Sequence, residues 1–353
     1  MFFRISGDDV MATLMHAHRE LYRRAPDERF PSVDAMLDHC RSQQRDSRDL
    51  WKPPGQLQVV EDDFGQVQLK TGTEGTVRLN DWSFSQLCRL ALVSKDTVNR
   101  VSGETASRIL RETLPQGDRP LQLLATGDRL RSVHGVTYSR LWNADLLAAV
   151  REVADDYGPP QTAFNEATGL YCGEQDLFCF LIDPSGWIEV DGEDFCPGFF
   201  VWNSEVGKRS LGIQTFWFQK VCCNHIVWDA RDVTEFTRKH TGNVRESLNE
   251  VRRLIELQAA RRDERRDSFA AVVRKAMHEK LGDEAEEVMK TLQKHDLGKE
   301  AVARAVKQLG ECGKPFTLWN LVDALTQQNV SLTYAGDRTE ADQKVAKLLE
   351  LSA

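Results

Sequence analysis

Basic and aromatic residues gather in residues 198–241, where their spacing could support binding of a polyanion. Two runs rich in Phe, Trp and Val flank a polar turn that carries Gly207, Lys208 and Arg209, and the sequence Arg-Lys-His follows at 238–240. Apolar runs joined by a glycine-bearing turn indicate a β-hairpin. The stretch therefore predicts a basic hairpin that leads into a helix.

The candidate nucleic-acid contacts are basic residues at or near predicted hairpin turns. Cations that hold phosphates and aromatic rings that stack on bases are what single-stranded nucleic acids require of a protein, and three tryptophans at 202, 217 and 228 lie close in sequence. Each of these residues alone is typical of a solvated charge or a core aromatic; their grouping favours a shared surface. The candidates are Arg129, Arg131, Arg140, Lys208, Arg209, Lys220, Arg238, Lys239 and Arg245.

Charge limits how such a surface can be built. The formal net charge is -8, from 46 Lys+Arg against 54 Asp+Glu. Residues 231–280 reverse the sign, with 13 Lys+Arg against 9 Asp+Glu. A polyanion would therefore have to meet a local basic face on an acidic protein.

The sequence lacks the motifs of several classes of enzyme. The chain contains neither a Walker-type phosphate loop nor a dinucleotide-binding glycine fingerprint, so ATP- or NAD-dependent catalysis is disfavoured. It also contains no Gly-x-Ser-x-Gly elbow. We expect no cofactor and no catalytic residue.

Metal binding is a weaker alternative, based on Cys222, Cys223 and His225. Alternate residues of a strand share a face, so Cys223 and His225 could contribute to one site while Cys222 could not easily join. Paired ligand spacing, as in structural zinc sites, is missing. Buried thiols and a structural histidine are the favoured interpretation.

A set of five acidic residues supports an alternative interpretation, a magnesium-dependent nuclease. The set comprises Glu189, Asp191, Glu193, Asp194 and Glu205. Such sites need carboxylates that converge on the ions, and the spacing from Glu205 to Lys208 differs from the usual acid-x-Lys strand end of restriction-type nucleases. A solvated acidic loop is favoured at 189–194, and the nuclease alternative predicts magnesium-dependent cleavage that Glu205→Ala abolishes.

The eight cysteines show no Cys-x-x-Cys pair, which favours reduced thiols. The N-terminus lacks the apolar core of a signal peptide, and no apolar run has the length to span a bilayer. These features predict a soluble cytoplasmic protein that does not contact membranes.

The order of predicted elements indicates an α+β fold. We expect helices over 9–24, 33–44, 82–93, 102–114 and 143–157, two strands within 57–79, a hairpin over 121–138, and strands over 162–171 and 176–182, followed by the basic hairpin. Hairpins supply neighbouring strands directly, so the prediction is a twisted antiparallel sheet packed on helices, then a long helix and a helical C-terminal region. The expected segments are a lead-in over 1–80, a core over 81–260 and a helical region over 261–353.

Several of these motifs resemble a family of phage- and plasmid-borne proteins of unknown function. The resemblance covers roughly residues 80–350 and rests on Asn203-Ser-Glu-Val-Gly207, Val221-Cys-Cys-Asn-His-Ile-Val227, Arg238-Lys-His-Thr-Gly242, the helix at 82–92 and the segment 318–326. It implies a mobile-element origin. The element order is also similar to that of the single-strand annealing superfamily, whose members assemble into rings or filaments that hold DNA in an outer groove; this likeness is one of fold, which does not fix function.

The leading hypothesis is a single-stranded DNA binding or annealing protein of a mobile element, acting in recombination without catalysis. It predicts self-association into a ring or filament, because one hairpin grips few nucleotides. The alternatives are a metal-dependent nuclease or other enzyme of mobile-element defence or counter-defence, and a protein-interaction factor.

Overall fold

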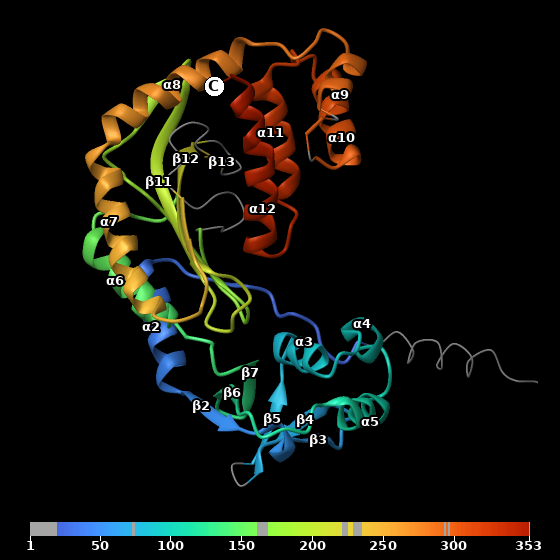
Figure 1. Ribbon diagram of the computed structural model, residues 1–353. Coiled ribbons are helices and arrows are strands. Elements are labelled where there is room, and N and C mark those ends of the chain that lie inside the picture. The colour runs from blue at the N-terminus through green and yellow to red at the C-terminus, as the bar shows by residue number, and fades with distance from the viewer. Residues whose placement is uncertain are drawn as a thin grey trace, which may run out of the picture. The chain divides into compact units, whose positions relative to one another are not determined.

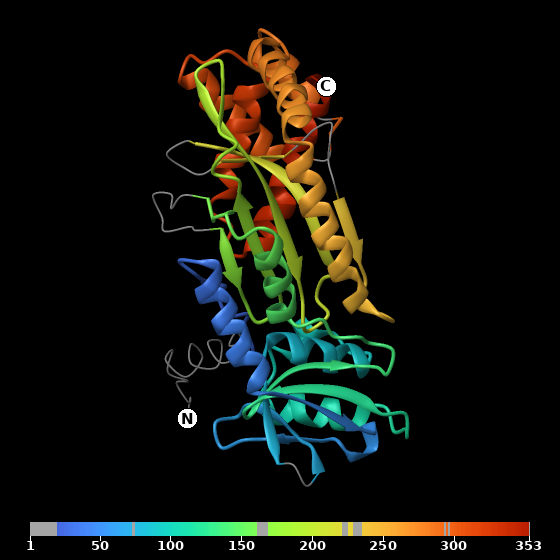
Figure 2. The ribbon, with the colours of Figure 1, turned by 90° about the vertical axis from the view of Figure 1, so that its left-hand side faces the viewer.

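The computed structural model describes residues 20–72, 75–160, 169–220, 225–228, 235–292, 294–295 and 297–352. The fold is α+β, with two mostly antiparallel sheets, helices packed on them and a helical C-terminal region (Figures 1 and 2). This confirms the predicted fold class. The chain forms two compact units: 20–25, 41–140 and 206–208 make the first, and 26–40, 141–205 and 209–352 the second.

The first unit is built on a six-stranded sheet. Its strands lie in the order β2-β6-β7-β5-β4-β3, and the β5–β7 pair is parallel. The expected two strands over 57–79 are in fact three, because the Asp62 Oδ1 accepts from the backbone N–H groups of Phe64 and Gln66 and fixes an extra turn. The strands are β2 (Ser47–Lys52), β3 (Gln58–Glu61), β4 (Val67–Lys70), β5 (Thr76–Leu79), β6 (Leu121–Thr126) and β7 (Arg129–His134).

Three helices cover one face of this sheet and form its apolar core: α3 (Asp81–Leu90), α4 (Lys95–Val98) and α5 (Gly103–Thr113). Each begins after a side-chain cap, supplied by Asn80, Ser94 and Ser102 respectively. Such caps satisfy backbone N–H groups that the first helical turn leaves without partners. The predicted helices over 82–93 and 102–114 are confirmed.

The second unit is built on an eight-stranded sheet. The main path is β1-β8-β9-β11-β12-β13, while β10 pairs with β11 and β14 with β12. The long hairpin of β11 and β12 is the basic hairpin predicted from the sequence. The strands are β1 (Glu28–Arg29), β8 (Leu170–Cys172), β9 (Leu177–Ile182), β10 (Ile188–Val190), β11 (Glu193–Asn203), β12 (Leu211–Gln219), β13 (His225–Trp228) and β14 (Glu235–Arg238).

Helices cover both faces of the second sheet (Figure 1). The helices α2 (Val33–Arg45), α6 (Asn143–Val153) and α7 (Ser247–Ala260) bury its main apolar core on one face. On the other face lie α11 (Leu318–Asn329) and α12 (Ala335–Ala346). The predicted long helix consists of α7 and α8 (Arg262–His278), which meet at Arg261, and the rest of the C-terminal region is α9 (Ala285–Leu292), α10 (Lys299–Glu311) and a 3-10 helix at Lys347–Ser352.

Some sequence-based boundaries differ from the structure. The expected border at residue 80 falls between β5 and α3 inside the first unit, and the border at 260 falls between α7 and α8 inside the second. Asn143 is the first residue of α6 rather than its cap. The expected helix at 9–24 and strand at 162–171 lie mostly outside the described residues, and residues 20–24 are not helical.

None of the helices in the described part of the chain has the length and apolar character needed to cross a membrane.

Candidate nucleic-acid interface

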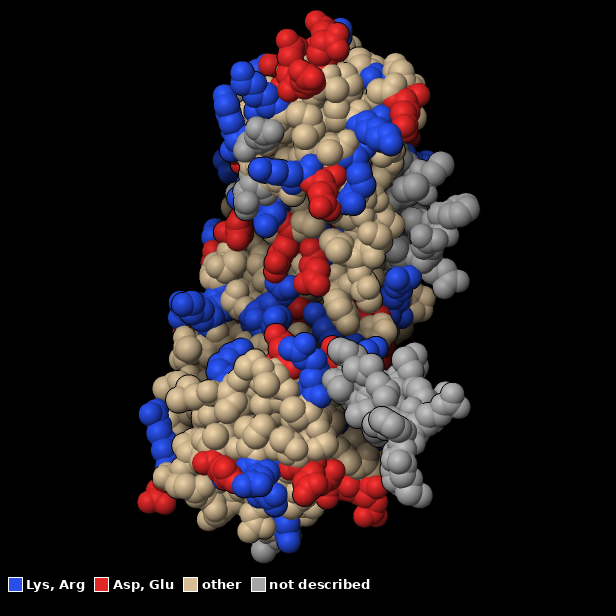
Figure 3. All heavy atoms as spheres, turned by 90° about the vertical axis from the view of Figure 1, so that its right-hand side faces the viewer, with Lys and Arg blue, Asp and Glu red and all other residues tan. Residues whose placement is uncertain are grey.

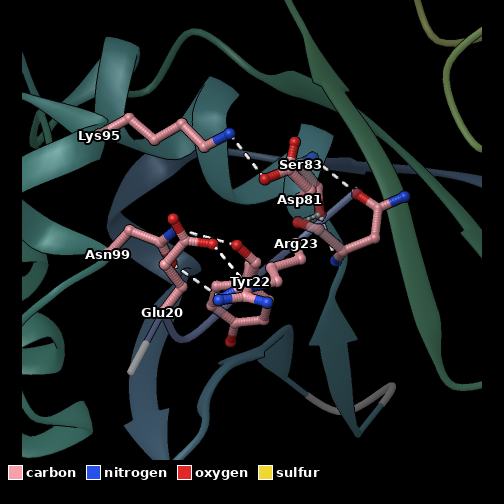
Figure 4. A network of polar contacts seen from close by, with 8 residues as sticks. Glu20, Tyr22, Arg23, Asp81, Ser83, Lys95 and Asn99 are labelled. Carbon is pink, nitrogen blue, oxygen red and sulfur yellow. Dashed lines mark hydrogen bonds and ion pairs between the residues drawn. The ribbon is translucent and has the colours of Figure 1, made fainter. Parts of the chain in front are cut away.

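A polar network fixes the N-terminus of α3 around Asp81 and Ser83 (Figure 4). Trp82 lies in the same turn. The Asn80 Oδ1 accepts from the Ser83 backbone N–H at 2.8 Å, and the Ser83 Oγ accepts from the Asn80 N–H at 3.0 Å. Asp81 forms an ion pair with Lys95 at 2.6 Å. The first turn of α3 is therefore held from two sides, which fixes the position of the Trp82 indole.

Two cations lie over the Trp82 ring. The Lys208 Nζ is 5.2 Å from the ring centroid and the Arg89 Cζ is 5.7 Å from it. The indole Nε1 donates to the Val206 carbonyl oxygen at 2.7 Å, and Val206, Lys208 and the intervening glycine all belong to the first unit. Lys208 is exposed whereas Trp82 is 6% exposed, so the buried indole positions a cation that faces solvent, an attractive geometry in itself.

Gly207 is required where it lies. Its φ is +72°, and an added Cβ would lie 2.6 Å from the His134 Cε1 and 3.1 Å from the Tyr138 Cε2. The two rings it contacts are stacked, with centroids 3.7 Å apart and planes 6° apart. The positive φ and this close approach explain glycine in the Asn203–Gly207 turn, and they place Lys208 beside Trp82.

A β-bulge shapes the face of the first sheet that lies opposite its apolar core. Leu124 pairs with Ser132 and Ala125 pairs with Leu130, so that Arg131 is the extra residue of β7. Leu130 joins the apolar core, whereas the Arg131 guanidinium lies 3.5 Å from the Ser47 Oγ on the opposite face. A bulge redirects a side chain in this way.

The buried arginines of this face are held by the protein itself. Arg131 is 5% exposed. The Arg140 side chain is 4% exposed, and its Nη2 donates to the Asp49 carboxylate at 2.7 Å. Two of the predicted nucleic-acid contacts therefore stabilise the sheet and are not placed to meet a phosphate, whereas Arg129, at the start of β7, is exposed.

The second unit holds another lysine over an indole. The Lys220 Nζ is 5.8 Å from the centroid of Trp187. Lys220 is exposed and Trp187 is half-buried, with its ring edge-on to Phe218 at 6.1 Å. Lys220 thus repeats in the second unit the arrangement of Lys208 in the first.

Arg209 is held by two carboxylates within the second unit. It donates through Nε to Asp176 at 2.7 Å, and it also forms an ion pair with Glu340 of α12. Asp176 has no exposed side-chain surface, while the Glu340 side chain is 59% exposed. Arg209 is therefore occupied in this state, with one buried and one accessible partner.

The remaining predicted contacts of the second unit are dispersed. Arg238 and Lys239 are exposed, and Arg245 lies 3.4 Å from Asp145. Arg238 pairs in register with Leu211, at the opposite end of β12 from Lys220. Nine strand residues separate the two ends, about 30 Å at the usual rise. The predicted single cluster is not assembled.

Carboxylates neutralise the cations of α7 and α8. Arg252 pairs with Glu152 at 2.8 Å, and Arg253 with Glu250 at 2.5 Å. Arg266 pairs with Asp263 at 3.2 Å. On the face of the second unit seen in Figure 3, basic and acidic side chains also lie among one another. Among the described residues of 231–280, paired carboxylates therefore interrupt the cations, which form no continuous basic band.

Sequence reasoning missed Trp82 and Trp187 and chose other tryptophans. Trp217 is fully buried and stacks on Phe269 at 4.3 Å, as a core residue. Trp202 is half-buried, and the side chain of Trp228 lies outside the described residues. Trp82 reads as a core position of an amphipathic helix, and no local pattern links it to Lys208 far along the chain.

The acidic candidates do not converge. Glu205 is 2% exposed and accepts from the Asn143 backbone N–H at 2.8 Å, so it stabilises the start of α6. Asp191 pairs with Arg274 and His278. Glu193 begins β11, an 11-residue strand, while Glu205 follows its end, about 30 Å away. Glu205, Asp191 and Glu193 therefore do not share one site.

No group of three His, Cys, Asp or Glu that could hold a metal ion occurs among the described residues. Cys222 and Cys223 lie outside those residues, as does the side chain of His225.

The described cysteines are free thiols. Burial raises the pKa of Cys88 to about 11, although Lys95 lowers it, and burial raises the pKa values of Cys179 and Cys196 to about 12. These three groups are therefore protonated at neutral pH, as inert core thiols are.

A family model described as Domain of unknown function (DUF932) matches residues 131–347, more than half of the chain. The chain belongs to this family. The matched region begins at Arg131 of the bulge and includes the Asn203–Gly207 turn, Arg209 and all of α12. No curated protein and no solved structure matches this chain.

Proposed function

We propose that this protein binds single-stranded DNA and promotes annealing of complementary strands without a catalytic step. The observation that carries the proposal is the repeated exposed lysine over an indole, Lys208 with Trp82 and Lys220 with Trp187. A lysine held over an indole supplies a positioned phosphate contact with little dependence on base type. Trp187 is half-buried and can also stack on a base, whereas Trp82 is 6% exposed and only positions its lysine.

Exposure decides which predicted residues take part. We assign phosphate contacts to exposed cations with no carboxylate within ion-pair distance among the described residues, together with Lys208. They are Arg129, Lys208, Lys220, Arg238 and Lys239. Arg131 and Arg140 serve the fold, and Arg245 is paired with Asp145.

Annealing and self-association extend this proposal. Only two of the assigned contacts lie on the first unit and three on the second, so a single copy would hold only a few nucleotides and repetition would multiply the affinity. We infer a ring or filament and a role in recombination of a phage, plasmid or other mobile element, supported by the resemblances of motif and element order. Light-scattering mass with and without oligonucleotide tests assembly, and an unchanged monomer that anneals strands would contradict it.

The salt dependence of oligonucleotide binding tests the lysine assignments. For single strands, the slope of log K against log salt is about -0.7 for each phosphate neutralised. Lys208→Ala with Lys220→Ala should therefore make the slope less negative by about 1.4. The measurement is fluorescence anisotropy of a labelled oligonucleotide between low and moderate salt.

Arg253→Ala is the matched control, because Arg253 is exposed and paired with Glu250 within one turn of α7. It should leave the slope unchanged. Equal effects of the control and the double variant would contradict the assignment of Lys208 and Lys220 as phosphate contacts. If the unaltered protein did not bind the oligonucleotide, the proposed function would be rejected.

A further inference from the structure

The second sheet carries a row of aromatic rings on the face opposite its main core. Phe178 and Phe180 of β9, Phe200 and Trp202 of β11, and Phe216 and Phe218 of β12 share this face. Phe180 and Phe200 stack at 4.8 Å and 11°, and Phe200 and Trp202 at 4.9 Å and 27°. Parallel rings at these separations resemble a stack of bases in spacing and in apolar character.

Glycines make room for the rings. Gly198 lies opposite Phe216 and Gly212 opposite Trp202 in the strand register. An added Cβ would lie 2.8 Å from the Phe216 Cζ at Gly198 and 2.0 Å from the Trp202 Cζ2 at Gly212. The rings lie flat across the neighbouring strand because these positions lack side chains. The result is an aromatic surface that spans adjacent strands.

The helix over this surface is a poor apolar partner. From α12, Ala335 and Ala346 join the aromatic cluster. The helix reads Ala-Gly-Asp-Arg-Thr-Glu-Ala-Asp-Gln-Lys-Val-Ala and has no large apolar side chain before Val345. Hydrophobic stabilisation scales with the apolar area buried, and alanine and glycine contribute little of that area from the side of α12. The phenylalanine rings beneath are at most 3% exposed, so stacked bases would have to cover them again when the helix leaves.

Polar contacts hold these first turns instead. The Ala335 N–H donates to the Asp27 carboxylate at 2.9 Å, and the Gln343 Nε2 donates to the Gln214 Oε1. Arg209 pairs with Glu340, and Gly336 allows the guanidinium to approach, since a Cβ there would lie 2.4 Å from the Arg209 Nη2. The C-terminal end is anchored differently, by Val345, Leu348 and Leu349 in another apolar cluster.

We propose that the aromatic face of the second sheet is a base-stacking surface for single-stranded nucleic acid. In the unbound protein α12 covers this surface, and the surface opens when a backbone phosphate replaces Glu340 on Arg209. The inference rests on the proposed function and deepens it. Buried Asp176 keeps Arg209 in place, while Glu340, being 59% exposed, can leave. Arginine binds phosphate in a bidentate manner, and α12 swings about its anchored C-terminal end.

A reversible cross-link between α12 and the sheet tests the opening. Gln214→Cys and Gln343→Cys are introduced in a Cys312→Ser background, because Cys312 is the exposed cysteine among those described. A short bifunctional methanethiosulfonate reagent then joins them. Anisotropy of a labelled oligonucleotide should show affinity at least about tenfold weaker when cross-linked, and dithiothreitol should restore it.

The controls separate the two proposals. The Cys312→Ser parent, treated with the same reagent, should bind as before. Unchanged affinity of the cross-linked protein overturns the opening of α12 and leaves the proposed function standing. Absent binding by the untreated parent rejects the proposed function and this inference with it.

A milder variant acts in the opposite direction. Glu340→Gln removes the competing carboxylate from an exposed ion pair and should tighten oligonucleotide binding about two- to fivefold. Glu350→Gln makes the same change at an exposed residue of the following 3-10 helix and should have a smaller effect. Equal effects of the two variants, or weaker binding by Glu340→Gln, would contradict the exchange on Arg209.

Discussion

The two sheets differ in the face that lies opposite their apolar core. In the first sheet, that face is polar, with Asp49, Arg131, Ser132 and Arg140 buried or paired on it. In the second sheet, it is aromatic and lies under a helix of small and charged residues. On the first face, the arginines bind carboxylates and hydroxyls of the same unit. Beside the second face, Arg209 binds one buried carboxylate and one accessible carboxylate.

The difference shows why a basic residue at a turn is weak evidence for ligand binding. Arg140 and Arg209 were both predicted as nucleic-acid contacts because each is a basic residue at or near a predicted hairpin turn. Arg140 is almost fully buried, whereas Arg209 pairs with an exchangeable carboxylate. Burial and the exposure of the partner, rather than charge, distinguish a structural cation from one that can bind a ligand.

The largest effect is expected at the polar face. Arg140→Ala leaves Asp49 without its buried partner and should lower the free energy of unfolding by about 3–5 kcal/mol. Urea denaturation followed by circular dichroism measures this. Arg129→Ala removes an exposed arginine of β7 and should change stability by less than about 0.5 kcal/mol. Similar values for the two variants would abolish the distinction between a buried structural arginine and an exposed one.

A second effect concerns the helix over the aromatic face. Burial raises the pKa of Asp342 from 3.8 to about 6, although Arg338 and the amide of Asn329 lower it. The folded protein therefore holds this proton more tightly than the unfolded chain, so that this contribution to stability is gained as pH falls through about 6 and lost as pH rises through it.

Asp342→Asn mimics the protonated group and should stabilise the protein at pH 7.5 by on the order of 3 kcal/mol. The gain should shrink as the pH approaches 4. Urea midpoints of both proteins at several pH values give the comparison, and a difference independent of pH would show that ionisation of Asp342 does not strain this helix.

The smallest effect is expected at Ser132, which is fully buried and whose Oγ has no hydrogen-bond partner among the described residues. Ser132→Ala removes a buried hydroxyl without breaking a hydrogen bond and should be neutral or stabilising by up to about 1 kcal/mol. A clear loss of stability would show that this hydroxyl has a hydrogen-bond partner, such as a water molecule at the polar face.

Local signals predicted most of the elements. Ser94 and Ser102 cap helices as expected, and the hairpins at 121–138 and 193–219 follow from apolar runs around turn residues. The division into units could not be predicted, because residues 206–208 join the first unit through contacts with Trp82 and His134 that are remote in sequence.

The candidate site was less predictable than the fold. Lys208 and Lys220 were identified from their hairpin, but their indole partners come from α3 and from the segment before β10. Arg209 was identified as a phosphate contact, but Glu340 lies 131 residues away. Pairing across such separations depends on tertiary packing, which residue type and spacing do not encode.

The extra residue in β7 has a consequence for how this hairpin tolerates change in length. Deleting Arg131 alone would leave Leu130 opposite Ala125 and Ser132 opposite Leu124, so plain alternation would return and every following side chain would keep its present face. A deletion at a regular position of the same strand would instead turn each following side chain to the other face. The bulge is therefore the position of β7 at which the loss of one residue is best tolerated.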